Sequence, residues 1–207
     1  MFISVAGRCL RYNRSMAPPS TFRLDTPHFK QSKMMCGPAS LKIVAQYFGI
    51  HKNEREFTRL CKANRIIGTS GKNLVRAAKV LGFTTRVFDD ADFGTIERWI
   101  RKGVPVIVNW MSPGQSRPPK VRMAGGHYSV VCGLNRTHIV LEDPGLGYRR
   151  TISRKDFMTV WFDFDDIYLK KRRSNTETRD CCRTEKVFLT PSVARSKSWR
   201  RRMLEPY

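Results

Sequence analysis

The sequence lacks any apolar run close to the roughly 18 residues that a membrane-spanning helix needs. Its longest candidate, Val104 to Val108, has the length of a buried β-strand. The sequence also contains no internal repeat. Its 207 residues suffice for one domain of typical size with additional tails, and 41% of them are hydrophobic. We therefore expect a soluble protein with a single globular domain.

The cysteines form no C-x-x-C pair, the spacing that zinc ligands commonly adopt. They stand at positions 9, 36, 61, 132, 181 and 182. Cys61 and Cys132 lie in apolar segments, which predicts that they are small core residues. We expect neither a metal site nor a cofactor. A reducing compartment, the cytoplasm, is the simplest expected location for such thiols.

Acidic residues are scarce at both ends of the chain. The sequence has 39 Lys and Arg against 17 Asp and Glu, which gives a net charge of +22. Residues 1–24 carry four Arg and no acid, and residues 169–207 contain clusters such as Lys170–Arg173. We predict a basic, disordered N-terminal extension over 1–24, a folded domain over 25–168 and a basic, disordered C-terminal tail over 169–207.

The role of these basic ends stays open. They could be solvated tails, or they could attract nucleic acid or another anionic surface weakly and without specificity. The Arg-containing, acid-free start is loosely similar to an organelle transit peptide. Met16 is an equally plausible alternative start, which would make the preceding residues a nonfunctional extension.

Helices are predicted in the first half of the domain. Apolar residues recur at helical spacing over 37–48, and Gly49 is suited to end that helix. Asn53 and Glu56 have the spacing of a capping box, which opens a second helix. A third helix is predicted over 70–81.

The second half of the domain is predicted to be mainly β-structure. Branched and aromatic residues indicate strands, with two short helices between them and a long loop rich in Pro and Gly over 111–126. The expected strands are 83–88, 104–109, 127–134, 137–141 and 148–152, and the expected helices are 93–100 and 153–161. Helices followed by an antiparallel sheet indicate an α+β fold.

Cys36 stands where the first helix begins. The free N–H groups and positive dipole end of a helix stabilise a thiolate, and this placement can lower a cysteine pKa from about 8.5 to roughly 3.5–7.5, particularly beside a protonated His. Pro38 suits the first helical turn, and Gly37 is expected to leave open space beside the sulfur. Cys36 is thus a candidate nucleophile, although a cysteine in this position alone more often indicates a buried structural thiol.

His127 and Asp143 strengthen the interpretation of Cys36 as a nucleophile. His127 follows Gly125–Gly126 at a strand end, where it would face a cleft. In a hairpin that turns at Asn135–Arg136, positions 127 and 143 return to within a residue of direct opposition. The carboxylate could then hold one imidazole nitrogen and leave the other to take the thiol proton. For Asp143 alone, capping of a turn is the alternative role.

A set of short motifs between residues 27 and 166 accompanies these three residues. The motifs are Gln31, Cys36–Leu41 (Cys-Gly-Pro-Ala-Ser-Leu), Gly68–Ala78, Gly125–Tyr128 and Glu142–Pro144. Together they resemble the bacteriocin-processing (double-glycine) peptidase family and its stand-alone relatives, a papain-like branch of the cysteine peptidases. The sequence shows no membrane-spanning or ATP-binding segment of the kind found when this domain is fused to an export transporter, so we expect a stand-alone copy.

The resemblance implies a papain-like α+β fold with a Cys–His–Asp triad formed by Cys36, His127 and Asp143. It also implies that the side-chain amide of Gln31, together with the backbone N–H of Cys36, binds the oxyanion of the tetrahedral intermediate. Gln31 precedes Cys36 by five residues, one fewer than we expect in most relatives.

Three functions are compatible with these residues. The first is hydrolysis of a peptide bond in a peptide or protein substrate through a thioester acyl-enzyme, and the resemblance implies cleavage after small residues such as Gly. The second is acyl or peptidyl transfer to an amine on the same triad. The third is a non-catalytic module that holds a peptide and carries a basic tail able to attract nucleic acid. The joint presence of Cys, His and Asp favours the peptidase.

Overall fold

The computed structural model describes residues 22–88, 91–112 and 125–161, together with the backbone of residues 186–191. The helices are α1 (Cys36–Tyr47), α2 (Glu54–Leu60), α3 (Gly71–Val80), α4 (Phe93–Ile100) and α5 (Arg154–Val160). The strands are β1 (Phe22–Arg23), β2 (Phe83–Phe88), β3 (Val106–Ser112), β4 (Gly125–Leu134), β5 (His138–Asp143), β6 (Tyr148–Ser153) and β7 (Lys186–Pro191).

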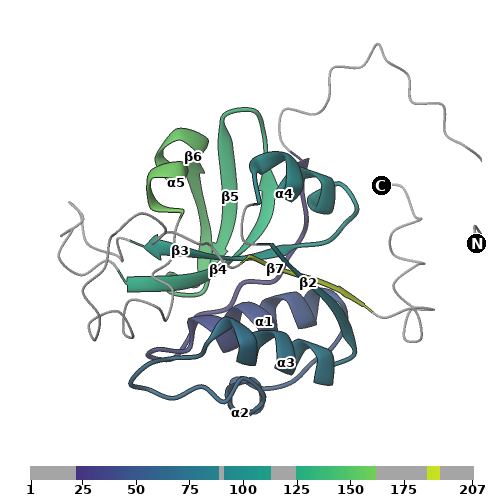
Figure 1. The fold of residues 1–207 in the computed structure, drawn as a ribbon, viewed down its shortest axis with the longest axis vertical. Coiled ribbons are helices and arrows are strands. Elements are labelled where there is room, and N and C mark those ends of the chain that lie inside the picture. The colour runs from purple at the N-terminus through teal and green to yellow at the C-terminus, as the bar shows by residue number, and fades with distance from the viewer. Residues whose placement is uncertain (1–21, 89–90, 113–124, 162–185, 192–207) are drawn as a thin grey trace, which may run out of the picture.

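The strands form one antiparallel sheet with helices on both faces (Figure 1). Its order is β2-β7-β3-β4-β5-β6, and β1 pairs with the end of β4 beyond the last residue that β3 covers. Helices α1, α2 and α3 lie against one face, and α4 and α5 lie on the other. Three helices precede most of the sheet, and the predicted α+β fold is therefore confirmed.

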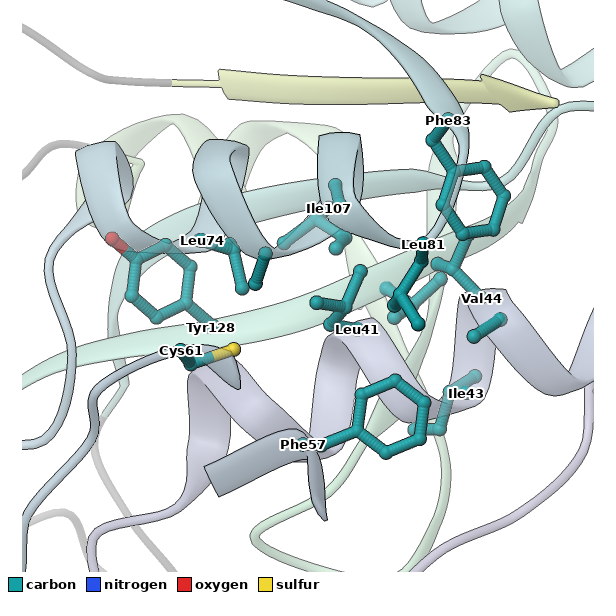
Figure 2. Packing of buried hydrophobic residues seen from close by; sticks show 14 residues of the cluster. Leu41, Ile43, Val44, Phe57, Cys61, Leu74, Leu81, Phe83, Ile107 and Tyr128 are labelled. Atoms are coloured by element: carbon teal, nitrogen blue, oxygen red, sulfur yellow. The ribbon is translucent and has the colours of Figure 1, made fainter. Parts of the chain in front are cut away.

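Helix α1 is buried along most of its length and anchors the first layer. Its residues from Gly37 to Ala45 are all buried. Figure 2 shows side chains of α1 packed together with Phe57, Leu74 and Ile107, which come from α2, α3 and β3. Burying each large apolar side chain contributes about 1.5–3 kcal/mol, so this helix is fixed firmly against the sheet. Cys36, the first residue of this helix, is therefore held in a fixed position as well.

The predicted helix boundaries and caps are confirmed. Gly49 follows α1 with a φ of 80°, the left-handed conformation that glycine adopts without strain. Asn53 and Glu56 form the predicted capping box, because the Asn53 side chain accepts from the Glu56 N–H and the Glu56 carboxylate accepts from the Asn53 N–H. Cys61 and Cys132 are fully buried, as predicted for core residues.

The predicted strands needed correction at both sides of the long loop. Strand β3 begins two residues later than predicted and runs on to Ser112, and β4 begins at Gly125. The extension follows from pairing, because Trp110, Met111 and Ser112 lie opposite His127, Gly126 and Gly125. The predicted loop 111–126 is shorter at both ends for this reason, and its residues 113–124 lie outside the described part of the chain.

The predicted disordered ends are wrong at two short segments. Lys186–Pro191, inside the predicted basic tail, form strand β7 between β2 and β3. Phe22–Arg23, inside the predicted N-terminal extension, form β1 and pair with Gly133 and Leu134. Residues 1–21, 162–185 and 192–207 lie outside the described part of the chain, so the rest of that prediction stays a prediction.

Candidate active site

Cys36 is the first residue of α1, and its side chain is half-buried. The residue before it, Met35, makes no side-chain capping hydrogen bond, so the positive end of α1 is left to act on the sulfur. The prediction that Gly37 leaves open space is wrong. A Cβ at Gly37 would lie 2.3 Å from Cγ2 of Thr69 and 3.3 Å from the ring of Tyr128. Glycine is needed here because protein atoms already occupy that space.

His127 lies near the start of β4, beside the nucleophile candidate. Its Nε2 is 2.7 Å from Oδ1 of Asp143, and its side chain is only 13% exposed. The ring of Trp110, which pairs with His127 across β3 and β4, packs edge-on against the imidazole with centroids 6.1 Å apart. Because Nε2 is engaged by the carboxylate, Nδ1 is the nitrogen available to the Cys36 thiol.

Asp143 ends β5 and is 2% exposed. Besides His127, its Oδ1 accepts a hydrogen bond from the Gly145 N–H at 2.9 Å. Its other oxygen, Oδ2, lies 3.4 Å from Nε of Arg150. A Cβ at Gly145 would approach the His127 ring to 3.2 Å, so the turn after Asp143 also packs directly against the imidazole.

The contact between His127 and Asp143 was predicted, but the register in which β4 pairs with β5 differs from the prediction. The turn between β4 and β5 is one residue longer than expected, and a bulge between Val131 and Gly133 adds an extra residue to β4. Val130 and Glu142 are the last paired residues at this end, so Asp143 lies one residue beyond the pairing and His127 three residues before Val130. Asp143 therefore reaches the imidazole diagonally.

The ionisation of the three side chains is coupled. Burial raises the pKa of the Cys36 thiol, but hydrogen bonding to His127, the charge of His127 and backbone hydrogen bonds from Tyr128 and Gly37 outweigh it, so its pKa lies below the ordinary 9.0. Burial lowers the pKa of His127, yet its hydrogen bonds and charge interactions with Asp143 and Cys36 raise it to about 9. The interactions between the two side chains therefore favour the charged pair, a thiolate beside an imidazolium.

The pKa of Asp143 moves the opposite way from that of a carboxyl group that is merely buried. Burial raises it, but the hydrogen bond and charge of His127, the charge of Arg150 and the Gly145 N–H together hold it below its ordinary value. The group is therefore a carboxylate throughout the pH range in which Cys36 and His127 titrate. It can orient the imidazole and stabilise its charged form.

Gln31 is brought to the same end of the sheet by the segment before α1. Its N–H donates to the carbonyl of Pro144, directly after Asp143, at 2.9 Å. Its side-chain Oε1 is buried and has no hydrogen-bond partner among the described residues. A buried amide oxygen without a partner is costly, and active sites are among the places where such groups are tolerated. The oxyanion role that the resemblance implies for Gln31 stays a prediction.

The sequence analysis did not predict the hydrogen-bond network that holds the segment before α1. Glu142, next to Asp143 on β5, is 1% exposed and accepts from Oγ1 of Thr26 at 3.1 Å. It also meets Nδ1 of His28 at 2.7 Å and Nε of Arg149. Arg149 in turn donates to the Thr26 carbonyl. The network ties residues 26–28 to β5 and β6, and thereby places Gln31 a few residues later.

Two other histidines, His51 and His138, are exposed, and His138 contacts Thr137. Trp110 and Tyr128 are core residues that also contact the site. Within the described ranges, no group of three His, Cys, Asp or Glu side chains could hold a metal ion. None of the helices in those ranges is long and apolar enough to cross a membrane.

The family of the chain follows from comparison with known proteins. The model of the Peptidase C39 family matches residues 26–165, which is 140 of the 207 residues and includes Gln31, Cys36, His127 and Asp143. The chain belongs to the Peptidase C39 family. Among curated proteins, none matches this C39 chain.

Solved structures support the same conclusion about the C39 fold. The peptidase domain of Streptococcus ComA, a bifunctional ABC transporter of a quorum-sensing pathway, is 25% identical with a TM-score of 0.55, and the match covers 83% of this chain and 99% of that one. A double-glycine motif protease from an AMS/PCAT transporter, solved with the leader peptide, is 17% identical (TM-score 0.54; 82% and 94% covered). A C39-like peptidase from Bacillus anthracis is 12% identical (TM-score 0.56; 84% and 99% covered), and these last two bear on the fold alone.

Proposed function

We propose that this C39 family member is a cysteine peptidase that cleaves a peptide bond, with Cys36 as nucleophile, His127 as general base and acid, and Asp143 as the orienting carboxylate. One observation carries the proposal: the buried His127 ring hydrogen bonds to Asp143 through Nε2 and also interacts with the Cys36 thiol. This is the arrangement that activates a cysteine nucleophile.

The reaction would begin from the thiolate–imidazolium pair. The Cys36 sulfur attacks the scissile carbonyl carbon, and the carbonyl π electrons move to its oxygen. As the tetrahedral intermediate collapses, the C–N bond breaks and the His127 imidazolium gives its proton to the leaving amine. Water then attacks the thioester while the neutral imidazole takes a water proton. Collapse of the second intermediate expels the thiolate, releases the acid product and restores the ion pair.

The oxyanion of each intermediate would be bound by the Gln31 side-chain amide and the Cys36 N–H at the start of α1. The hydrogen bond from the Gln31 backbone N–H to the Pro144 carbonyl supports this role, because it holds this residue beside the turn that follows Asp143. The side-chain NH₂ group, not Oε1, would donate to the oxyanion. Removing one donor from an oxyanion hole typically lowers kcat by roughly 10²–10³-fold.

The substrate would be a peptide or protein cut after a small residue such as Gly. Support comes from the family and from the solved double-glycine motif protease whose structure contains the leader peptide. The comparisons do not support nucleic-acid binding by the basic ends, and the clusters Lys170–Arg173 and Arg200–Arg202 lie outside the described residues. That accessory property stays a prediction of the sequence alone.

Acyl transfer to an amine is the second candidate, since the same thioester would serve both reactions. The test is incubation of the full chain with a peptide library containing Gly-Gly sites, with and without an added amine such as glycinamide, followed by mass spectrometry of the products. We expect free carboxylate products, absent with Cys36→Ala and reduced roughly 10²-fold or more with Gln31→Ala. Products that carry the added amine in preference to water would indicate a transferase. Cleavage that persists with Cys36→Ala would contradict both assignments.

A further inference from the structure

Arg150 projects from β6 toward the carboxylate of the candidate triad. It pairs with Leu141 across β5 and β6, so the two side chains lie on the same face of the sheet. Asp143 is two residues beyond Leu141 on β5 and shares that face. The Nε of Arg150 lies 3.4 Å from Oδ2 of Asp143, the oxygen that His127 does not contact. Both oxygens of the carboxylate are therefore engaged.

The guanidinium is held by more than the carboxylate. Its central carbon lies 5.5 Å from the centroid of the Trp110 ring, the ring that packs edge-on against His127. The Arg150 side chain is only 17% exposed, so solvent screens its charge less than that of a surface arginine. A planar guanidinium that lies against an aromatic ring and faces a carboxylate is a geometry lysine cannot reproduce fully.

The neighbouring arginine serves as a built-in comparison. Arg149 pairs with Glu142 in the register of β5 and β6, on the opposite face of the sheet from Asp143. Its side chain bonds Glu142, the Thr26 carbonyl and Asp25, none of which belongs to the candidate triad. The two arginines thus carry the same charge on the same strand but face different carboxylates.

We propose that Arg150 is a positioning residue of the triad. It fixes Oδ2 of Asp143 and sets the pH range in which the Cys36–His127 pair is charged. The proposal rests on the function proposed above. Arg150 would act through Asp143, because the guanidinium prevents the carboxylate from rotating away from Nε2 of His127. Its positive charge would also favour the Cys36 thiolate and disfavour the imidazolium.

The titratable groups that meet at this cluster come from four elements. They are Cys36 from α1, His127 from β4, Asp143 from β5 and Arg150 from β6. Lys30 adds a further cation at the same turn, since its Nζ donates to the Gly145 carbonyl. Lys30 is exposed, whereas Arg150 is mostly buried, so Arg150 should have the larger effect on the pair.

The test is the pH dependence of Cys36 alkylation by iodoacetamide, followed by intact mass and peptide mapping. The full chain is compared with Arg150→Gln and with Arg149→Gln, which removes the same charge from the other face. We expect the midpoint of the Cys36 titration to rise by about half a pH unit to one unit in Arg150→Gln. Arg149→Gln should leave the midpoint unchanged. Arg150→Lys should keep the midpoint close to that of the parent, because lysine retains the positive charge.

Arg150→Met keeps an unbranched side chain on Trp110 and gives the same comparison if Arg150→Gln does not fold. The role of Arg150 would be overturned, with the triad left intact, if the folded Arg150 variant (Gln or Met) had the same midpoint as Arg149→Gln and the parent. A parent protein whose Cys36 titrates like an ordinary thiol would instead contradict the proposed function, and the role of Arg150 with it.

Discussion

Strand β5 ends in two carboxylates, Glu142 and Asp143, and each holds a histidine at 2.7 Å. The two pairs lie on opposite faces of the sheet because adjacent strand residues alternate. His127 is 13% exposed, whereas His28 is 52% exposed. The distance between histidine and carboxylate is therefore the same in a candidate catalytic pair and in a structural one.

The difference between the pairs lies in the groups that surround each one. The His127 ring interacts with Cys36, and this interaction lowers the pKa of the thiol against the effect of burial. The Glu142 carboxylate is shared instead among Thr26, His28 and Arg149. A buried carboxylate with several donors fixes chain segments in place, whereas one that orients a histidine toward a thiol prepares a reaction.

The largest difference between the two pairs is expected when the histidines are removed. His127→Ala should lower kcat/KM for peptide cleavage by roughly 10⁴-fold, because the reaction loses its base and acid. His28→Ala should change it less than about threefold, since His28 is half-exposed and does not contact the triad. Steady-state or single-turnover cleavage of one peptide checks both variants. A comparable loss of kcat/KM in the two variants would mean that the two faces of the sheet do not have separate roles.

A smaller difference is expected when the carboxylates are made neutral. Asp143→Asn should lower kcat/KM by roughly 10²–10³-fold, because an amide cannot stabilise the imidazolium. Glu142→Gln should act chiefly on stability and cost about 1–3 kcal/mol, since the buried amide cannot satisfy all three donors of Glu142. Denaturant unfolding and cleavage rates, measured on the same samples, separate these effects. The comparison would fail if Glu142→Gln left stability unchanged and abolished cleavage.

Much of the fold and the grouping of the candidate triad could be predicted from sequence because the signals are local. The capping box at Asn53 and Glu56 and the glycine after α1 mark their helices within a few residues. The order of Cys36, His127 and Asp143 at element ends indicated one site. The register was wrong because neither the bulge near Cys132 nor the three-residue turn leaves a distinctive local pattern.

Features that depend on distant residues were not predictable in this way. Glu142 and His28 are 114 positions apart, and only the folded sheet brings them together. Strand β7 is a short run of β-forming residues within a basic segment, and its place between β2 and β3 depends on the whole sheet. Gly37 was misjudged because Thr69, which packs against it, comes from a loop of unpredicted path.

The most direct test of the account is the rate of cysteine alkylation by iodoacetamide from pH 4 to 9 in the parent and in His127→Ala. Cys61 and Cys132 serve as internal controls, because burial raises their pKa values to about 12 and about 11. We predict that Cys36 reacts well below pH 8 in the parent, since its pKa is lowered, and that His127→Ala loses this reactivity. If Cys36 reacts no faster than an ordinary thiol in both proteins, Cys36 and His127 do not form an activated pair and the proposed peptidase is contradicted.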